Sequence, residues 1–143
     1  YDPKSIDAVV LTHAHIDHTG RIPKLVKDGF SGKIVATQPT KDFTELLLED
    51  SAGILEEEAQ ERKVPALYGR GDLPAALSLF VTQEYGKERE IAPGVKLTLH
   101  NAGHVLGSSI AEIRIEDKTL VFSGDLGNPP TPLLRQTVLT QRT

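Results

Sequence analysis

The amino-terminal part of the chain alternates short apolar runs with polar and helical segments. Residues 6–11 (IDAVVL) are rich in aliphatic side chains and too few for a helix, which predicts a buried strand. Residues 21–28 carry Ile22, Leu25 and Val26 at helical spacing, and Gly29 is a natural helix stop. Residues 33–37 (KIVAT) predict a second strand. The expected order is strand, polar loop, helix and strand.

Two further helices are predicted in the middle of the chain. Thr40 suits the N-cap of a long helix. The apolar positions of this helix are Phe43, Leu46, Leu47, Ile54 and Leu55. Asp72 suits the cap of a short helix with Pro74 in its first turn, and Leu77 and Phe80 are expected to face inward.

The second half of the chain is dominated by strand patterns. Apolar and polar residues alternate over residues 95–99 and 111–115, and another short apolar run covers residues 120–123. These segments are predicted to form neighbouring antiparallel strands. Because strand and helix patterns mix along the whole length, the predicted class is mixed α/β, with helices covering one face of a sheet.

Composition and charge narrow the class of protein. The 143 residues are 38% hydrophobic and 25% charged, as expected for one globular domain, and no run of about 18 apolar residues could cross a membrane. The net charge of −4 gives no support to nucleic-acid binding by the whole surface. The chain has no cysteine, so nitrogen and oxygen atoms must hold any transition metal. Nothing resembles a signal peptide at Tyr1, and we expect a cytoplasmic segment that begins inside a larger protein.

Three of the five histidines lie within six residues, in the sequence THAHIDH that follows the first predicted strand. In an extended segment the side chains of residues i and i+2 point the same way, so His13 and His15 can face one ion while Asp17 and His18 face another. The alternative is a helix-capping loop whose histidines are hydrogen-bonded. Three clustered imidazoles are costly to bury without partners, which favours a metal site.

Two later residues are candidates to join this cluster. His104 lies between glycines in AGHVLG, directly after a predicted strand, and Asp125 follows another strand in FSGDLG. Each has an alternative role, His104 as a turn residue and Asp125 in an Asx-turn. The sequence setting of His100 favours a strand residue near solvent, and we do not count it as a ligand.

The three motifs THAHIDHTG, AGHVLGS and FSGDLG together resemble the metallo-β-lactamase superfamily, and in particular its β-CASP branch of nucleic-acid-processing nucleases. The resemblance covers nearly the whole chain. It implies an αββα sandwich, of which this chain is the amino-terminal half. The segment GNPPTPLL (residues 127–134) resembles the lead-in to the β-CASP insertion, so the 143 residues are expected to be a partial metallo-β-lactamase domain that ends there.

The resemblance also implies a set of metal ligands and a cofactor. His13, His15 and His104 would hold one zinc ion, Asp17 and His18 a second, and Asp125 would bridge the two. The family pattern has an upstream aspartate and a downstream histidine that cannot be placed in this sequence. We therefore expect the 143 residues alone to show little hydrolytic activity. Iron or manganese could replace zinc at such nitrogen and oxygen ligands.

The predicted activity is phosphodiester hydrolysis by a hydroxide that two zinc ions activate, with Asp17 orienting the attacking group and Asp125 as the second catalytic carboxylate. The resemblance favours RNA as the substrate. A DNA nuclease of the same branch and a glyoxalase-like thioester hydrolase remain alternatives with the same histidine motif. A non-catalytic scaffold domain is a third alternative. The presence of all six ligands that can be placed in this sequence argues against it.

Overall fold

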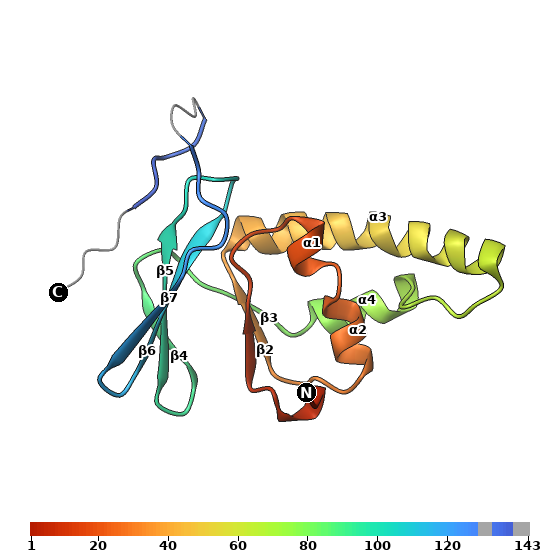
Figure 1. Cartoon of the computed structure of the whole chain (residues 1–143), viewed down its shortest axis with the longest axis horizontal. Coiled ribbons are helices and arrows are strands. Elements are labelled where there is room, and N and C mark those ends of the chain that lie inside the picture. The colour runs from red at the N-terminus through yellow and green to blue at the C-terminus, as the bar shows by residue number, and fades with distance from the viewer. Residues whose placement is uncertain (129–132, 139–143) are drawn as a thin grey trace.

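The computed structural model describes residues 1–128 and 133–138 and shows three layers, one of helices and two of strands (Figure 1). The first sheet is parallel, in the order β1 (Ala8–Val10), β2 (Lys33–Ala36) and β3 (Phe80–Thr82). The second is antiparallel, in the order β4 (Glu88–Ala92), β5 (Val95–Asn101), β6 (Ser109–Ile115) and β7 (Lys118–Phe122). The mixed α/β class and the antiparallel strands of the second half are confirmed.

The helices lie on the outer side of the parallel sheet (Figure 1). They are α1 (Ile16–Thr19), α2 (Ile22–Lys27), α3 (Gln38–Arg62) and α4 (Leu73–Leu77), with short 3-10 turns at Pro3–Ser5 and Arg70–Asp72. Helix α2 agrees with the predicted segment, and Gly29 follows it with a φ of 110°. Among the described residues, no helix combines the length and apolar character that a membrane crossing requires.

Strand β2 shows how the layers share one core. Its residues Ile34, Val35 and Ala36 are fully buried because both faces of the strand are covered. Ile34 and Ala36 belong to the apolar cluster under the helices, whereas Val35 belongs to the cluster between the two sheets. Because successive side chains of a strand point to opposite faces, β2 packs against the helix layer with one face and against the antiparallel sheet with the other.

The start of α3 differs from the prediction. The N-cap is Thr37, not Thr40, because the Thr37 hydroxyl accepts a hydrogen bond from the backbone N–H of Thr40 and Pro39 is tolerated in the first turn. The buried face of α3 consists of Thr40, Thr44, Leu48, Ala52 and Gly53. The predicted apolar positions Phe43, Leu46 and Ile54 are instead exposed.

The predictions around α4 were partly right. Asp72 is the N-cap residue and Pro74 lies in the first turn, as predicted, but the Asp72 carboxylate makes no cap hydrogen bond and instead accepts from the backbone of Gly69 and from Lys27. Phe80 does not belong to this helix but begins β3, where it pairs with Ile34. Strands β3 and β4 had not been predicted. The predicted lead-in segment, residues 127–134, falls partly on residues 129–132, which lie outside the described residues, as do residues 139–143.

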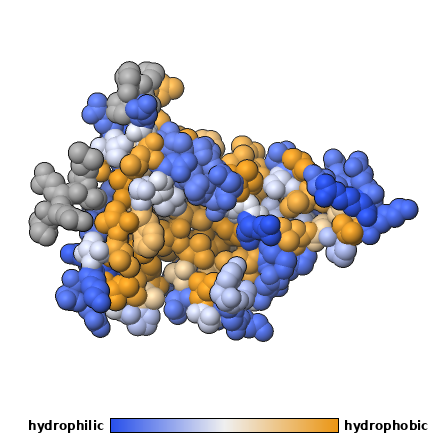
Figure 2. All heavy atoms as spheres, in the orientation of Figure 1, coloured by the Kyte–Doolittle hydropathy of each residue, from blue (hydrophilic) through white to orange (hydrophobic). Residues whose placement is uncertain are grey.

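An apolar hollow of about 760 Å³ opens between the two sheets, on the side where β1 and β7 are the edge strands. Its lining includes Ile6, Val10, Ile113, Leu120 and Phe122. The apolar surface between the sheets is visible in Figure 2. Leu120 and Phe122 are about half exposed there. Exposed apolar surface of this kind marks a contact site.

The loop after β5 is hydrogen-bonded to the start of α3 through Gly107. The carbonyl oxygen of Gly107 accepts hydrogen bonds from the hydroxyls of Thr37 (2.7 Å) and Thr40 (2.9 Å). Gly107 has a φ of 85°, and a Cβ there would lie 2.7 Å from the Thr40 nitrogen. We expect Gly107→Ala to lower the free energy of unfolding by about 2–4 kcal/mol, measured by urea denaturation.

Gly86→Ala is the matched control for this substitution. Gly86 also has a positive φ, of 70°, but a Cβ there would meet nothing within 4 Å. It should lower the free energy of unfolding by only about 1–2 kcal/mol, which is the cost of the left-handed backbone alone. Equal losses in the two variants would contradict the proposed contact between Gly107 and the start of α3.

Candidate metal centre

Three segments that are distant in sequence meet at the carboxyl end of the parallel sheet. The first leaves β1 at Thr12 and enters α1, the second is the loop between β5 and β6, and the third follows β7. The carbonyl oxygen of Thr12 accepts hydrogen bonds from the backbone nitrogen (2.6 Å) and the hydroxyl (3.1 Å) of Ser109, the first residue of β6. These bonds join the two sheets at the place where the candidate ligands lie.

The histidines of the first segment lie partly on extended chain and partly on the short helix α1. His13 is in the extended part of the chain and His15 is the N-cap of α1, and their rings meet edge to face with centroids 4.8 Å apart. Asp17 and His18 belong to the short helix α1, where an extended loop had been predicted. His18 still faces the group, because its ring centroid lies 4.2 Å from that of His13.

His104 and Asp125 both reach this cluster. The Nε2 atom of His104 lies 3.3 Å from Nδ1 of His15 and 3.5 Å from Oδ2 of Asp125. The same Oδ2 atom lies 3.7 Å from Nε2 of His13. The predicted juxtaposition of the early histidine segment with His104 and Asp125 is therefore present. One ligand atom from each of these four residues can be chosen so that all lie within 4.8 Å of one another.

The separations in this group fit a metal ion better than direct hydrogen bonds. Donor and acceptor atoms in a direct hydrogen bond are about 2.7–3.2 Å apart. Four ligands at about 2.1 Å from a tetrahedral zinc ion are about 3.4 Å from one another. The distances of 3.3, 3.5 and 3.7 Å given above bracket that value. The residues present therefore fit a metal ion.

The burial of His13 supports the same conclusion. Its side chain is fully buried, its Nδ1 lies 3.1 Å from the Thr12 hydroxyl, and its Nε2 has no hydrogen-bond partner. A buried nitrogen without a partner is costly unless something occupies its lone pair. That nitrogen points toward Asp125 and the other rings of the cluster.

The two carboxylate oxygens of Asp125 face different groups. Oδ2 faces His13 and His104, whereas Oδ1 lies 3.8 Å from Nε2 of His18. His18 is in turn 3.5 Å from Oδ2 of Asp17, whose side chain is 76% exposed. Asp125 thus lies between a set of three imidazoles and a second, more open set formed by His18 and Asp17.

His100 lies apart from the cluster. It is on β5, and its Nε2 is 3.1 Å from the carboxylate of Glu112 on β6. Within residues 1–128 and 133–138, the group of His13, His15, His104 and Asp125 is the one cluster found with metal-ligand spacing.

Hydroxyl groups that support the cluster were missed in the sequence. Thr19 is fully buried, and its hydroxyl donates to the carbonyl oxygens of Ala14 (3.1 Å) and His15 (3.0 Å). The Ser108 hydroxyl accepts from the backbone nitrogens of His104 and Val105. The available signal was a serine or threonine within four residues of each candidate histidine, a spacing that permits such local bonds.

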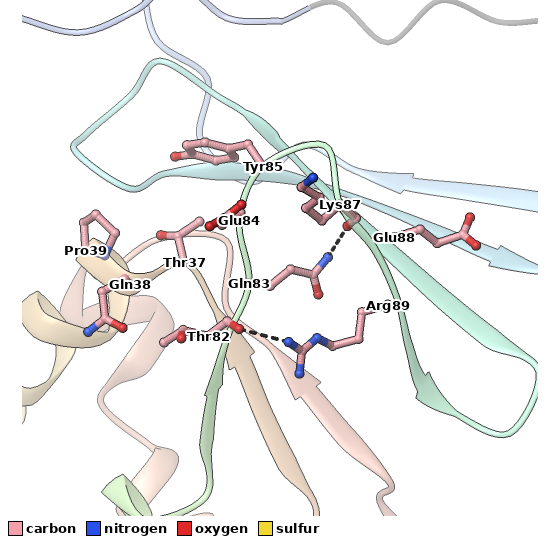
Figure 3. A pocket seen from close by; sticks show the side chains of 10 residues that line it. All are labelled: Thr37, Gln38, Pro39, Thr82, Gln83, Glu84, Tyr85, Lys87, Glu88 and Arg89. Atoms are coloured by element: carbon pink, nitrogen blue, oxygen red, sulfur yellow. Dashed lines mark hydrogen bonds between the residues drawn. The ribbon is translucent and has the colours of Figure 1, made fainter.

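A separate hollow of about 610 Å³ lies where α3 begins and β3 ends, and none of the histidines lines it (Figure 3). The buried side chain of Gln83 donates to the backbone oxygens of Lys87 (2.7 Å) and Leu97 (3.0 Å). Arg89 donates to the backbone oxygen of Thr82. These bonds connect β3 to the antiparallel sheet, and we assign them a structural role.

The layered fold and the histidine and aspartate cluster at the sheet edge define a class of metal-binding α/β proteins. The chain belongs to the metallo-β-lactamase superfamily, whose family model matches residues 1–137. A chain of a protein of unknown function from Enterococcus faecalis superposes with a TM-score of 0.55 at 19% identity, over 83% of this chain and 24% of that one. This likeness supports the fold, and the family resemblance predicted from the three motifs is confirmed.

Two curated relatives match nearly the whole chain. Transcription termination factor FttA of Methanococcus maripaludis is 40% identical over 137 residues, which is 94% of this chain and 21% of the relative. Ribonuclease TTHA0252 of Thermus thermophilus is 38% identical over 151 aligned positions, which cover 100% of this chain and 33% of the relative. The chain thus spans about a fifth to a third of the length of these relatives. Their names agree with the β-CASP resemblance.

Burial of the cluster predicts a pH effect on stability in the metal-free protein. The pKa of His13 is lowered from its ordinary value of 6.5, first because burial penalises the charged ring and second because of His18. Near pH 6.5 and somewhat below, the unfolded chain therefore binds more protons at this position than the folded chain. The stability that His13 contributes is complete above pH 6.5 and is lost as the pH falls through the lowered pKa.

Urea unfolding of the metal-free chain across this pH range tests the prediction. The free energy of unfolding should fall less steeply with decreasing pH in His13→Gln than in the wild type, because glutamine does not titrate. His100→Gln, outside the cluster, serves as the control for loss of a histidine. Identical slopes for the wild type and His13→Gln would show that His13 is not held neutral by its burial.

Proposed function

We propose that this chain is the metal-binding part of a hydrolase that cleaves phosphodiester bonds in RNA, as a β-CASP-type ribonuclease. The observation that carries the proposal is the position of Asp125, whose Oδ2 faces the ring nitrogens of His13 and His104 and whose Oδ1 faces that of His18. A pair of ions sharing one carboxylate is a common arrangement for phosphodiester hydrolysis. The relatives named as a ribonuclease and as transcription termination factors support RNA as the substrate.

In the proposed site His13, His15 and His104 would hold one zinc ion, Asp17 and His18 would hold a second, and Asp125 would contribute to both. The bound ions would supply an activated water and an electrophilic partner for the scissile phosphate. His13 is fixed by burial, and the backbone nitrogen of His104 is bound by the Ser108 hydroxyl. Two of the proposed ligands are thus held in place by burial or by a hydrogen bond to the backbone.

Asp17 has a different setting, which suits a catalytic role. Its carboxylate is mostly exposed and lies 3.5 Å from Nε2 of His18. It is thus free to accept a hydrogen bond from the attacking water and to orient it toward the substrate. In the proposal Asp17 and Asp125 are the catalytic carboxylates.

An arginine in a hollow beside the cluster supports a phosphate-containing substrate. The hollow measures about 590 Å³; its lining is mostly apolar and includes the charged residues Arg21, Lys24 and Asp28, with His18 on the side of the cluster. Lys24 is already paired with Asp28, but no carboxylate of the described residues lies within ion-pair distance of Arg21. Arginine binds phosphate groups through several N–H donors at once. In the proposal Arg21 contacts the RNA backbone beside the cleaved bond.

The proposed domain organisation follows from the apolar hollow and the length of the relatives. Residues 1–143 would be a partial metallo-β-lactamase domain that ends at the start of a β-CASP insertion. Further polypeptide would then cover the hollow between β1 and β7 and add to the second set of ligands. The cytoplasmic location expected from the sequence remains part of this proposal.

Metal analysis of substituted proteins tests the ligand assignment. We expect Asp125→Asn and His104→Ala each to weaken zinc binding by roughly tenfold or more, measured by competition with a chromogenic chelator. His100→Ala should bind zinc as the wild type does, because His100 pairs with Glu112 outside the cluster. Wild-type affinity in Asp125→Asn would exclude the bridging role.

Parallel assays with labelled RNA, labelled DNA and a thioester test the activity on the full-length polypeptide that contains this chain. The proposal predicts metal-dependent RNA cleavage that Asp17→Asn reduces by at least about 100-fold. Cleavage of DNA but not RNA would favour a related DNA nuclease, and turnover of the thioester alone would overturn the nuclease proposal. A protein that purifies without stoichiometric metal and cleaves none of the three would be a scaffold.

A further inference from the structure

We infer that Thr12 is a positioning residue of the metal centre, whose hydroxyl fixes the tautomer of His13 and whose side chain and carbonyl hold the other two ligand segments against it. The inference rests on the proposed function, in that it takes the cluster to bind a metal. It assigns a role to a residue that is itself no candidate ligand.

The first step concerns the two ring nitrogens of His13. Nε2 is the nitrogen that faces Asp125, and it has no hydrogen-bond partner. A nitrogen that binds a metal must offer its lone pair, so the proton of the neutral ring must be on Nδ1. Nδ1 lies 3.1 Å from the hydroxyl of Thr12, which accepts that proton's hydrogen bond. The hydroxyl thereby stabilises the tautomer that leaves Nε2 free.

The second step concerns the segment that carries His104. The carbonyl oxygen of Thr12 accepts two hydrogen bonds from Ser109, one from its backbone and one from its hydroxyl. Ser109 directly follows Ser108, whose hydroxyl accepts from the backbone nitrogen of His104. A short chain of hydrogen bonds therefore connects Thr12 to the backbone of His104.

The third step concerns the segment that carries Asp125. Gly124 precedes it with a φ of 55°, and a Cβ on Gly124 would lie 2.7 Å from both Cβ and Oγ1 of Thr12. The backbone just before Asp125 thus packs directly on the Thr12 side chain. Because Thr12 contacts all three segments, a change in its shape would move ligands that are up to 113 positions away in the sequence.

Two substitutions separate the hydroxyl from the shape of the side chain. Thr12→Val keeps the shape that Gly124 packs against but removes the hydroxyl, whereas Thr12→Ser keeps the hydroxyl. We expect Thr12→Val to weaken zinc binding by about tenfold and Thr12→Ser by no more than about threefold. Thr119→Val, at an exposed position on β7, is the control for the same chemical change elsewhere.

Nitrogen-15 NMR of the metal-free chain gives a second readout that does not depend on zinc. At about pH 8, where the imidazole is neutral, the wild type and Thr12→Ser should show His13 with its proton on Nδ1. Thr12→Val should show a substantial population protonated on Nε2. A merely structural role for Thr12 would leave this ratio unchanged in any variant that folds.

The outcomes distinguish failure of the inference from failure of the proposed function. An unchanged tautomer ratio and zinc affinity in Thr12→Val would overturn the inference while leaving the metal site intact. Equal losses in the valine and serine variants would also overturn it, because the hydroxyl would then not be the cause. If the wild type bound no zinc, the proposed function would fail, whereas the tautomer ratio would still report on the contact between Thr12 and His13.

Discussion

The backbone contact between the end of β1 and the start of β6 decides where every proposed ligand lies. The carbonyl oxygen of Thr12 accepts two hydrogen bonds from Ser109, and this joins the parallel sheet to the antiparallel sheet at one edge. The loop with His104 precedes β6, and the turn with Asp125 follows β7, which pairs with β6. This contact, together with the apolar core between the sheets, brings His13, His104 and Asp125 to one place.

The candidate ligands at the carboxyl end of the parallel sheet differ in how deeply they are buried. His13 itself is enclosed, and this burial disfavours its charged form and lowers its pKa, whereas His15 is exposed and His104 is half-buried. Asp17 is the most open of these residues, with 76% of its side chain exposed. A buried ligand such as His13 suits a tightly held ion, whereas exposed ligands suit the side from which water and substrate must approach.

The ligand cluster could be predicted from the sequence because its residues lie in short motifs with local geometry. The extended backbone at His13 and His15 places two imidazoles on one side, whatever the rest of the fold does. The convergence of His104 and Asp125 on them was expected from the family resemblance and from their positions after strands. The supporting hydroxyl of Thr12 gave only a weak signal, its closeness to His13 in the sequence, because a threonine beside a strand is ordinary.

Other parts of the fold could not be derived from local patterns. Strand β4, with sequence EREIA, has mostly polar residues because its outer face is exposed, so it shows no apolar run. The buried face of α3 uses Thr40 and Thr44, and tertiary contacts with Gly107 set where that helix begins. Of the apolar residues named from the sequence, Phe43 and Leu46 lie on its exposed side while Leu55 packs against the core, so hydrophobic spacing alone does not define the buried face.

Anomalous X-ray diffraction from zinc-containing crystals tests the central claim most directly, because it locates the ions independently of activity. The proposed ligand set predicts one strong peak surrounded by His13, His15 and His104, and a second near Asp17 and His18, each about 2.0–2.2 Å from a different oxygen of Asp125. Zinc bound elsewhere, or a carboxylate of Asp125 turned away from both peaks, would contradict the proposed site.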